Sequence, residues 1–431
     1  MLFSCGNTQN TTSETRNTNH NDASSISKDA NYAFAKADSA TLHTTNEIEK
    51  TNETISQEQP IIVGANRTKE YLPLLQNKKV GVVTNQSGLI FKTPNHNKEQ
   101  STHLVDSLLQ HGITIKRVYS PEHGFRGTAD AGENVKDGKD ANTGLPIISL
   151  HGKNKKPTQE QLEGIDVMLF DIQDVGVRFY TYISTLTYVM EAAAEKGIPV
   201  IILDRPNPNA HYIDGPTLEP AHSSFLGMHP IPLVYGMTIG EYAKMVNGER
   251  WLKDGIQCDI TIIPLQNWDY QTPYSLPTRP SPNLPNDQSI NLYPSLGFFE
   301  GTTINAGRGT EMQFQIFGSP KFPSEYFPFT YTPQSNFGAK NPKEKGNLCH
   351  GMDLRDQEYL ARVNLEWLVE AYTAHSDKEN FFKTKSFTLH AGSEKLQAQI
   401  IRGYTFKEIK KGWYADLDRF KETRKKYLIY Q

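Results

Sequence analysis

Short apolar runs that alternate with helical segments are the feature of this sequence that most restricts its fold. From Pro60 onward these runs and segments follow one another as strands and helices do in a parallel α/β sheet. Thr158 and Gln161 fit a capping box, which predicts a short helix before the fourth strand. We therefore predict a doubly wound α/β fold, with strands at residues 79–84, 115–119, 147–150, 167–170 and 200–203 and helices at 102–110 and 182–196.

The second half of the chain has weaker patterns. A helix is expected between residues 235 and 251 and a strand at 260–264. The prolines between Pro273 and Pro294 predict irregular structure at a domain junction or at the rim of a crevice. Aromatic residues nearer the C-terminus, such as Trp367 and Trp413, are expected in a core.

The residues before Pro60 have a different composition. Residues 7–59 are mostly Asn, Thr, Ser, Asp, Glu and Lys, so they bury too little apolar surface to offset the entropy cost of ordering. Leu2 to Gly6 resembles a bacterial lipobox, although only four residues precede Cys5, which also allows a chance match. We predict that Cys5 is lipidated and that residues 1–59 form a lipoprotein-like N-terminus with a polar tether behind this cysteine. This arrangement would place the protein in a bacterial cell envelope.

Composition excludes several classes of function. The chain has 45 Lys and Arg against 48 Asp and Glu, a net charge of −3, so nucleic acid is not an expected partner. No apolar run approaches the roughly 20 residues that span a bilayer. Three scattered cysteines are too few for a disulfide framework or a zinc site with short ligand spacing.

Four predicted strands end in hydrogen-bonding side chains. In an open parallel sheet these ends lie along one edge, where ligands bind. We therefore expect the four segments to converge on one site, although any single polar strand end is more simply explained as a helix cap or a solvated loop. The segments are 85–86, 120–127, 171–178 and 204–208, and they contain Asn85, Glu122, His123, Arg126, Asp171, Gln173, Asp174, Arg178, Asp204, Arg205 and Asn207.

The side chains at these strand ends favour carbohydrate chemistry. No glycine-rich phosphate loop follows the first strand and no G-x-S-x-G motif is present, so nucleotide cofactors and serine-type acyl transfer are disfavoured. A metal site made by His123, Asp171, Asp174 and Asp204 remains an alternative. Amides, arginines and aromatic rings such as Tyr180 suit an acidic sugar, which makes glycoside hydrolysis by carboxylic acids the leading prediction.

Longer motifs resemble one known family. The segments 120–127, 170–182, 203–208, 280–285 and 299–310 closely resemble the exo-β-N-acetylmuramidase family of bacterial cell-wall glycosidases, and the resemblance extends from about Gly64 to Tyr430. It implies a Rossmann-like catalytic domain, placed at 60–285, and a smaller α+β auxiliary domain at 286–431 that contributes to the crevice. It also implies release of N-acetylmuramic acid from the non-reducing ends of peptidoglycan fragments, without a cofactor or metal. The stretch 302–306 departs from the family pattern.

The resemblance places the catalytic carboxylate on Glu122, within Pro-Glu-His-Gly. We predict that burial raises the pKa of Glu122, that Asp171 is the partner carboxylate, and that His123 orients it. Arg178 and Arg205 are predicted either to bind the lactyl carboxylate of muramic acid or to form structural ion pairs. Two alternatives stay open: a non-catalytic muropeptide receptor and a metal-dependent hydrolase. The predicted substrate-binding residues are Asn85, Arg126, Gln173, Asp174, Arg178, Tyr180, Asp204, Arg205, Asn207, Asn283, Glu300 and Arg308.

Overall fold

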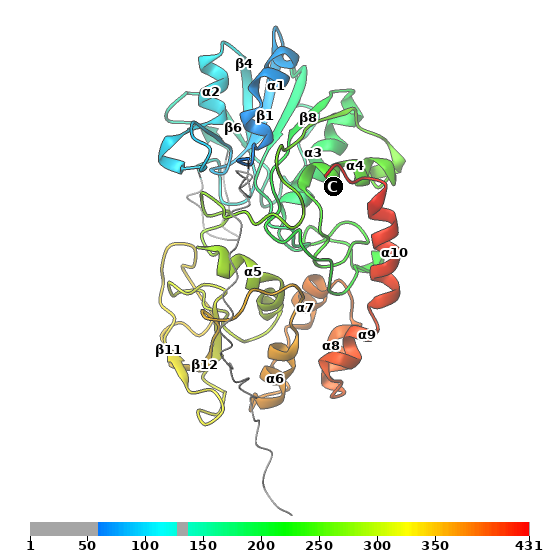
Figure 1. Cartoon of the computed structure of the whole chain (residues 1–431). Helices are drawn as coiled ribbons and strands as arrows, with labels where there is room; N and C mark the ends of the chain where they lie inside the picture. Colours follow the sequence, from blue (N-terminus) through cyan, green and yellow to red (C-terminus); the bar gives the residue numbers. More distant parts are fainter. Residues whose placement is uncertain (1–58, 127–136, 431) are drawn as a thin grey trace, which may run out of the picture. The chain divides into compact units, whose positions relative to one another are not determined.

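The computed structural model describes residues 59–126 and 137–430 (Figure 1). The described residues contain a mostly parallel seven-stranded sheet in the order β5-β6-β4-β1-β7-β8-β9. Only β5 runs antiparallel to its neighbour. The strands are β1 (Lys79–Thr84), β4 (Thr114–Ser120), β5 (Gly138–Lys139), β6 (Pro146–Ser149), β7 (Val167–Asp171), β8 (Val200–Leu203) and β9 (Ile260–Ile263).

The strand order is that of a Rossmann fold. When the six parallel strands β1, β4, β6, β7, β8 and β9 are numbered in chain order, the sheet reads 3-2-1-4-5-6. The order reverses between β1 and β7, which pair in register from Val80 with Val167 to Thr84 with Asp171. This reversal is the topological switch point at which sheets of this type bind ligands.

Helices cover both faces of the sheet. Alternate residues of its strands point to opposite sides, so each face carries apolar side chains that a layer of helices buries. In β1, Val80 and Val82 belong to the same core as α1 and α2, whereas Val83 belongs to the core that holds α3 and α4. These helices are α1 (Thr68–Leu75), α2 (Leu104–Gln110), α3 (Tyr182–Lys196) and α4 (Ile239–Gly248). The predicted doubly wound α/β fold is confirmed.

A smaller C-terminal part follows α5 (Asp287–Leu296). It has an antiparallel sheet in the order β10-β12-β11. Its elements are β10 (Ile316–Ser319), β11 (Phe329–Tyr331), β12 (Cys349–Asp353), α6 (Glu366–Ala374), α7 (Thr384–Ala391), α8 (Lys395–Ile401), α9 (Phe406–Lys411) and α10 (Tyr414–Lys425). The hairpin β2 (Leu89–Phe91) with β3 (Ser101–His103) and the 3₁₀ turns η1 (Gly64–Asn66), η2 (Lys98–Gln100), η3 (Pro220–His222), η4 (Lys253–Gly255) and η5 (Gly297–Gly301) complete the described elements.

The chain beyond α10 (red in Figure 1) returns to the Rossmann-like sheet. The ring of Tyr430 is buried in the same core as β1, and its hydroxyl lies 2.5 Å from Oδ2 of Asp204. The backbone N–H of Leu265 donates to the same hydroxyl at 3.0 Å. The residues at the C-terminus thus complete the domain that begins the fold.

Two local predictions were wrong. Thr158 and Gln161 make both hydrogen bonds of a capping box, but residues 159–164 form turns, because Gly164 adopts a left-handed φ of 71° and ends the segment. The proline-rich passage also contains a regular helix, α5, which Asn286 caps and which continues past Pro294. No helix among the described residues is both long and apolar enough to cross a membrane.

Candidate active site

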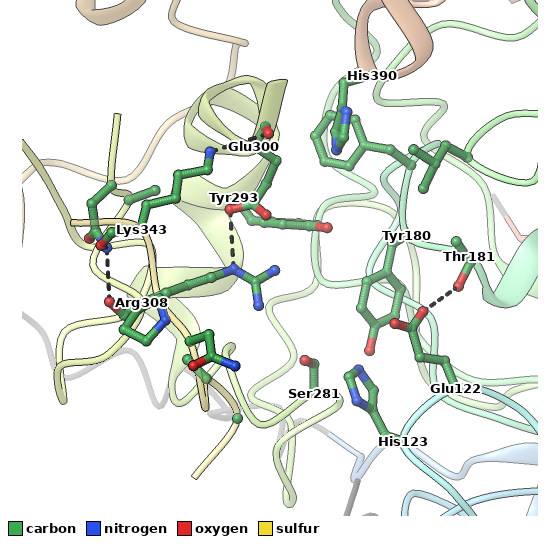
Figure 2. Close-up of a pocket in the computed structure, with 18 of the residues that line it drawn as sticks. Glu122, His123, Tyr180, Thr181, Ser281, Tyr293, Glu300, Arg308, Lys343 and His390 are labelled. Atoms are coloured by element: carbon green, nitrogen blue, oxygen red, sulfur yellow. Dashed lines mark hydrogen bonds and ion pairs between the residues drawn. The ribbon is translucent and has the colours of Figure 1, made fainter. Parts of the chain in front are cut away.

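A cavity of about 720 Å³ opens beside the switch point of the Rossmann-like sheet. One wall consists of Glu122 and His123, which follow β4, and of residues 179–182, which precede and begin α3. The opposite wall comes from the C-terminal part of the chain and includes Tyr293, Glu300 and Arg308 (Figure 2). The cavity therefore exists only where the two parts meet.

Glu122 presents its carboxylate to the cavity from the first of these walls (Figure 2). The side chain is partly buried, and Oε2 accepts a hydrogen bond from the hydroxyl of Thr181 at 3.2 Å. The next residue, His123, is 4% exposed and has a left-handed φ of 71°, a conformation that is uncommon for residues other than glycine. The tight turn after Pro121 therefore aims two neighbouring functional groups at the cavity.

Two tyrosines of this wall are held by the same main-chain carbonyl. The hydroxyl groups of Tyr180 and Tyr182 donate to the carbonyl of Pro280 at 2.7 Å and 3.2 Å. Asn85 donates to the hydroxyl of Tyr182 at 2.9 Å, so this predicted substrate-binding residue supports a cavity residue instead of lining the cavity. Burial raises the pKa of both phenols, which therefore remain neutral donors.

The opposite wall carries an ion pair. Nε of Arg308 lies 3.1 Å from Oε1 of Glu300. Lys343 donates to the main-chain carbonyls of Phe299 at 2.6 Å and Glu300 at 3.2 Å. Burial alone would raise the pKa of Glu300, but Arg308, Lys343 and His390 lower it to about 2. Burial lowers the pKa of Lys343 to about 8.

Backbone geometry holds Arg308 in this position. Asn305 donates through Nδ2 to the carbonyls of Arg308 at 3.0 Å and Lys343 at 2.8 Å. Gly307 adopts a φ of 78°, and a Cβ atom there would lie 2.4 Å from the carbonyl oxygen of Met312. Any other residue at position 307 would disturb the turn that presents the arginine.

Tyr293 lies between the two carboxylates (Figure 2). Burial raises the pKa of its phenol, Arg308 opposes that rise, and the charges of Glu300 and Glu122 add to it. Both carboxylates therefore act electrostatically on the same ring, which indicates that they face one shared space.

Asp171 does not point into the crevice, and that expectation was wrong. Its side chain is fully buried, and its oxygens bind Arg205 at 2.6 Å through Nε and 2.9 Å through Nη2. Arg205, 2% exposed, also donates to the carbonyl of Leu89 at 3.0 Å. Neither residue lines the cavity. Arg205 therefore forms a structural ion pair, the alternative that the sequence left open, but its partner is Asp171 and not the expected Asp204.

Arg178 does not line the cavity either. It is fully buried and donates to four main-chain carbonyls, those of Pro216, Ile231, His390 and Ala391, at 2.6–3.0 Å. Burial lowers the pKa of this guanidinium to about 9. The residue joins the loops after β8 to α7, and it makes no ion pair with Asp174.

The remaining strand-end residues also hold the scaffold, so the expected convergence of four strand ends on one site was wrong. Asp174 accepts from Tyr235 and from the N–H of Gly176, and burial raises its pKa to about 6. Asp204 accepts from Thr238 at 2.7 Å and Gly240 at 2.8 Å, and burial raises its pKa to about 7. Four other predicted residues also bind protein groups. Gln173 donates to the carbonyl of Pro206, and Asn207 donates to that of Met237. Asn283 donates to the carbonyl of Gly338, and Arg126 pairs with the carboxylate of Asp140.

These contacts also test the proposed metal ligands. Asp171, Asp174 and Asp204 each bind different partners, and none of the three lines the cavity with His123. Within residues 59–126 and 137–430, no group of three or more His, Cys, Asp or Glu side chains has the arrangement of a metal site. The four predicted ligands are therefore not a donor set.

Several lining residues were not predicted as site residues. Ser281 belongs to a motif that the sequence had marked, whereas Tyr293 lies on α5, within the passage expected to be irregular. Lys343 and His390 stand in segments without a motif, and only the folded chain brings them to Glu300. Cys5 lies outside the described residues.

A Rossmann-like sheet whose switch point opens on carboxylates, tyrosine rings and an arginine defines a candidate enzyme for polar ring substrates such as sugars. The chain belongs to the NamZ family of exo-β-N-acetylmuramidases. The family model "Exo-beta-N-acetylmuramidase NamZ, N-terminal" matches residues 80–288, and the corresponding C-terminal model matches residues 291–430. The family resemblance inferred from the motifs is confirmed.

Individual relatives agree with this assignment. The chain is 39% identical over 383 residues to the peptidoglycan beta-N-acetylmuramidase NamZ of Bacillus subtilis strain 168, covering 84% of this chain and 89% of that protein. A crystal structure of a DUF1343 family protein from Bacteroides fragilis NCTC 9343 matches with a TM-score of 0.77 and 42% identity, over 86% of this chain and 99% of its own. A second such protein from the same organism matches with a TM-score of 0.71 and 28% identity, over 86% and 100%.

Proposed function

We propose that this protein is a glycoside hydrolase, an exo-β-N-acetylmuramidase that releases terminal N-acetylmuramic acid from the non-reducing ends of peptidoglycan fragments. The observation that carries the proposal is the position of Glu122, which faces Arg308 and Tyr293 across one cavity in a chain of the NamZ family.

Glu122 is the general acid in this proposal. Glycoside hydrolysis needs a carboxylic acid that is protonated before it acts on the leaving oxygen. Among the described residues that line the cavity, the carboxylates are Glu122 and Glu300. A pKa of about 2 keeps Glu300 ionised at any working pH, so it has no proton to donate. That role therefore falls to Glu122.

Arg308 binds the lactyl carboxylate that distinguishes muramic acid from glucosamine. A guanidinium has several N–H donors, and only Nε of Arg308 is bound to Glu300. Lys343 adds a second positive charge nearby, so the wall has an excess of positive charge over the single carboxylate. In this arrangement Glu300 is a positioning residue that orients Arg308.

Turnover of a chromogenic β-N-acetylmuramide, with and without a chelator, tests the proposal. We expect chelator-insensitive turnover, with kcat lowered about 10²-fold or more in Glu122→Gln while the melting temperature is unchanged. Tight muramide binding without turnover would support the receptor alternative instead. Loss of turnover in chelator would support the metal-dependent alternative.

We further propose that the protein acts in the cell envelope, held by a lipid on Cys5. A polar tether behind a lipidated cysteine would hold the enzyme at a membrane surface. Labelling of cells with a fatty-acid analogue tests this proposal: wild-type protein should carry the label and Cys5→Ser should not. Unlabelled wild-type protein would exclude the anchor.

A further inference from the structure

A second cavity, of about 390 Å³, adjoins the candidate active site. Its lining includes Gln86, Lys98, Arg126, Arg279, Pro282 and Phe337. Ser281 and Gly338 line the first cavity, and their chain neighbours Pro282 and Phe337 line the second. The same two loops therefore separate the two spaces and form a wall of each.

Direct contacts hold these loops together. Nδ2 of Asn283 donates to the carbonyl of Gly338 at 2.8 Å. A Cβ atom on Gly338 would lie 2.7 Å from Cβ of Pro282, so the loops are in close contact.

Hydrogen bonds also connect the lining of the second cavity to that of the first. Nε2 of Gln86 donates to the carbonyls of Arg279 at 3.1 Å and Pro280 at 3.2 Å. The carbonyl of Pro280 is the acceptor for Tyr180 and Tyr182 in the first cavity. The backbone at Arg279 is thus one residue away from the carbonyl that holds Tyr180 and Tyr182 in the first cavity.

The charges around the second cavity favour an anion. Arg126 pairs with Asp140 at 2.8 Å and with Asp106 at 3.6 Å, which offsets its charge. Lys98 and Arg279 are exposed and take part in none of the ion pairs found among residues 59–126 and 137–430. Two cationic side chains therefore have their donors available for an acidic ligand.

An exposed aromatic ring completes this surface. Phe337 is 57% exposed although it lines a cavity, so its ring face is available for stacking. Sugar rings and aromatic rings bury apolar area against each other, and cations beside such a ring select an acidic sugar. The two cations and the ring of Phe337 resemble the wall around Arg308 in their chemistry, but they lie outside the candidate active site.

We propose that the second cavity binds a carboxylate carried by the leaving part of the glycan. This inference rests on the proposed function, because a glycan that alternates muramic acid with glucosamine carries its next carboxylate on the next internal muramic acid. That carboxylate is either the free lactyl group or one at the end of a stem peptide. Arg279 and Lys98 bind it, and Phe337 packs against the sugar that carries it.

The test compares saccharides that differ only in the internal acid. The charged substrate is the tetrasaccharide with alternating N-acetylmuramic acid and N-acetylglucosamine, and the neutral control has N-acetylglucosamine at every position except the terminal muramic acid. We expect Arg279→Gln to raise KM for the charged substrate about five- to tenfold without changing kcat, and to leave the neutral control unchanged. Lys98→Gln is expected to act in the same direction.

A matched variant and a second substrate pair make the result decisive. Arg402→Gln removes an exposed arginine that lines none of the described cavities and should leave both KM values unchanged. Attachment of a stem peptide to the internal muramic acid identifies the source of the carboxylate: a greater effect of Arg279→Gln on this substrate favours the peptide, and a smaller one favours the lactyl group. Equal wild-type KM values for charged and neutral saccharides would overturn the second site. Failure to cleave the simple chromogenic muramide would overturn the proposed function itself.

Discussion

Replacement of Asp171 by Asn separates a structural role from a catalytic one. The variant leaves the buried guanidinium of Arg205 with one amide oxygen in place of two carboxylate oxygens at 2.6 Å and 2.9 Å. Removing one partner of a buried ion pair costs about 3–5 kcal/mol. Because the amide and the carbonyl of Leu89 still accept from Arg205, we expect the lower end, about 3 kcal/mol.

Thermal unfolding and steady-state kinetics measure the two roles together. A loss of about 3 kcal/mol lowers the melting temperature by roughly 6 °C, at about 2 °C per kcal/mol for a protein of this size. The folded fraction is expected to keep kcat on a chromogenic muramide within about twofold of wild type, because Asp171 does not line the cavity.

A double variant provides the control. Asp171→Asn with Arg205→Met removes the unpaired charge as well, and should recover part of the lost stability. The reasoning fails if Asp171→Asn melts within 1 °C of wild type and yet loses about 10²-fold in kcat. That result would return Asp171 to the catalytic role that its place at a strand end suggested.

Three other predictions follow from the site. Arg308→Met should lower kcat/KM for a muramide about 10- to 100-fold, the value of a lost charged hydrogen bond, and hardly change it for an N-acetylglucosaminide; equal losses on both sugars would make Arg308 architectural. Glu300→Gln should raise KM for the muramide several-fold with kcat within about threefold, because it loosens Arg308; a loss confined to kcat would instead give Glu300 a direct catalytic role. Burial raises the pKa of Asp204 to about 7, against about 4 in the unfolded chain, so its contribution to stability is fully present below about pH 4 and is lost as the pH rises to about 7. The melting temperature should therefore fall between about pH 4 and pH 7, and Asp204→Asn should flatten that slope; an unchanged slope would contradict the assignment.

Local pattern predicted most strands and helices of the Rossmann-like half of the fold, but not α1, β5 or the turns at 159–164. Strand β7 and helix α3 have the bounds that their apolar runs and the following glycine predict, to within one residue. Glu122 was also placed in the cavity from its position after β4 together with the family motif. These features depend on residues that are close in the sequence.

The partners of buried charges were harder to predict. Arg178 and Arg308 are both arginines near a carboxylate in the sequence, yet the first binds main-chain carbonyls as far away as Ala391, 213 residues on, and only the second faces the cavity. The wall formed by Lys343 and His390 likewise depends on long-range packing. A single sequence shows which groups carry charge, but the fold decides which of them remain available to a ligand.

The contact between Leu265 and Tyr430 also determines when the Rossmann-like domain can finish folding during synthesis. The two residues are 165 positions apart, which a ribosome covers in roughly 10–30 s at 5–20 residues per second. Throughout that interval Asp204 has no phenol to bind, and the core around β1 lacks a ring that fills it. The core of the nascent Rossmann-like sheet therefore stays incomplete until Tyr430 has been synthesised.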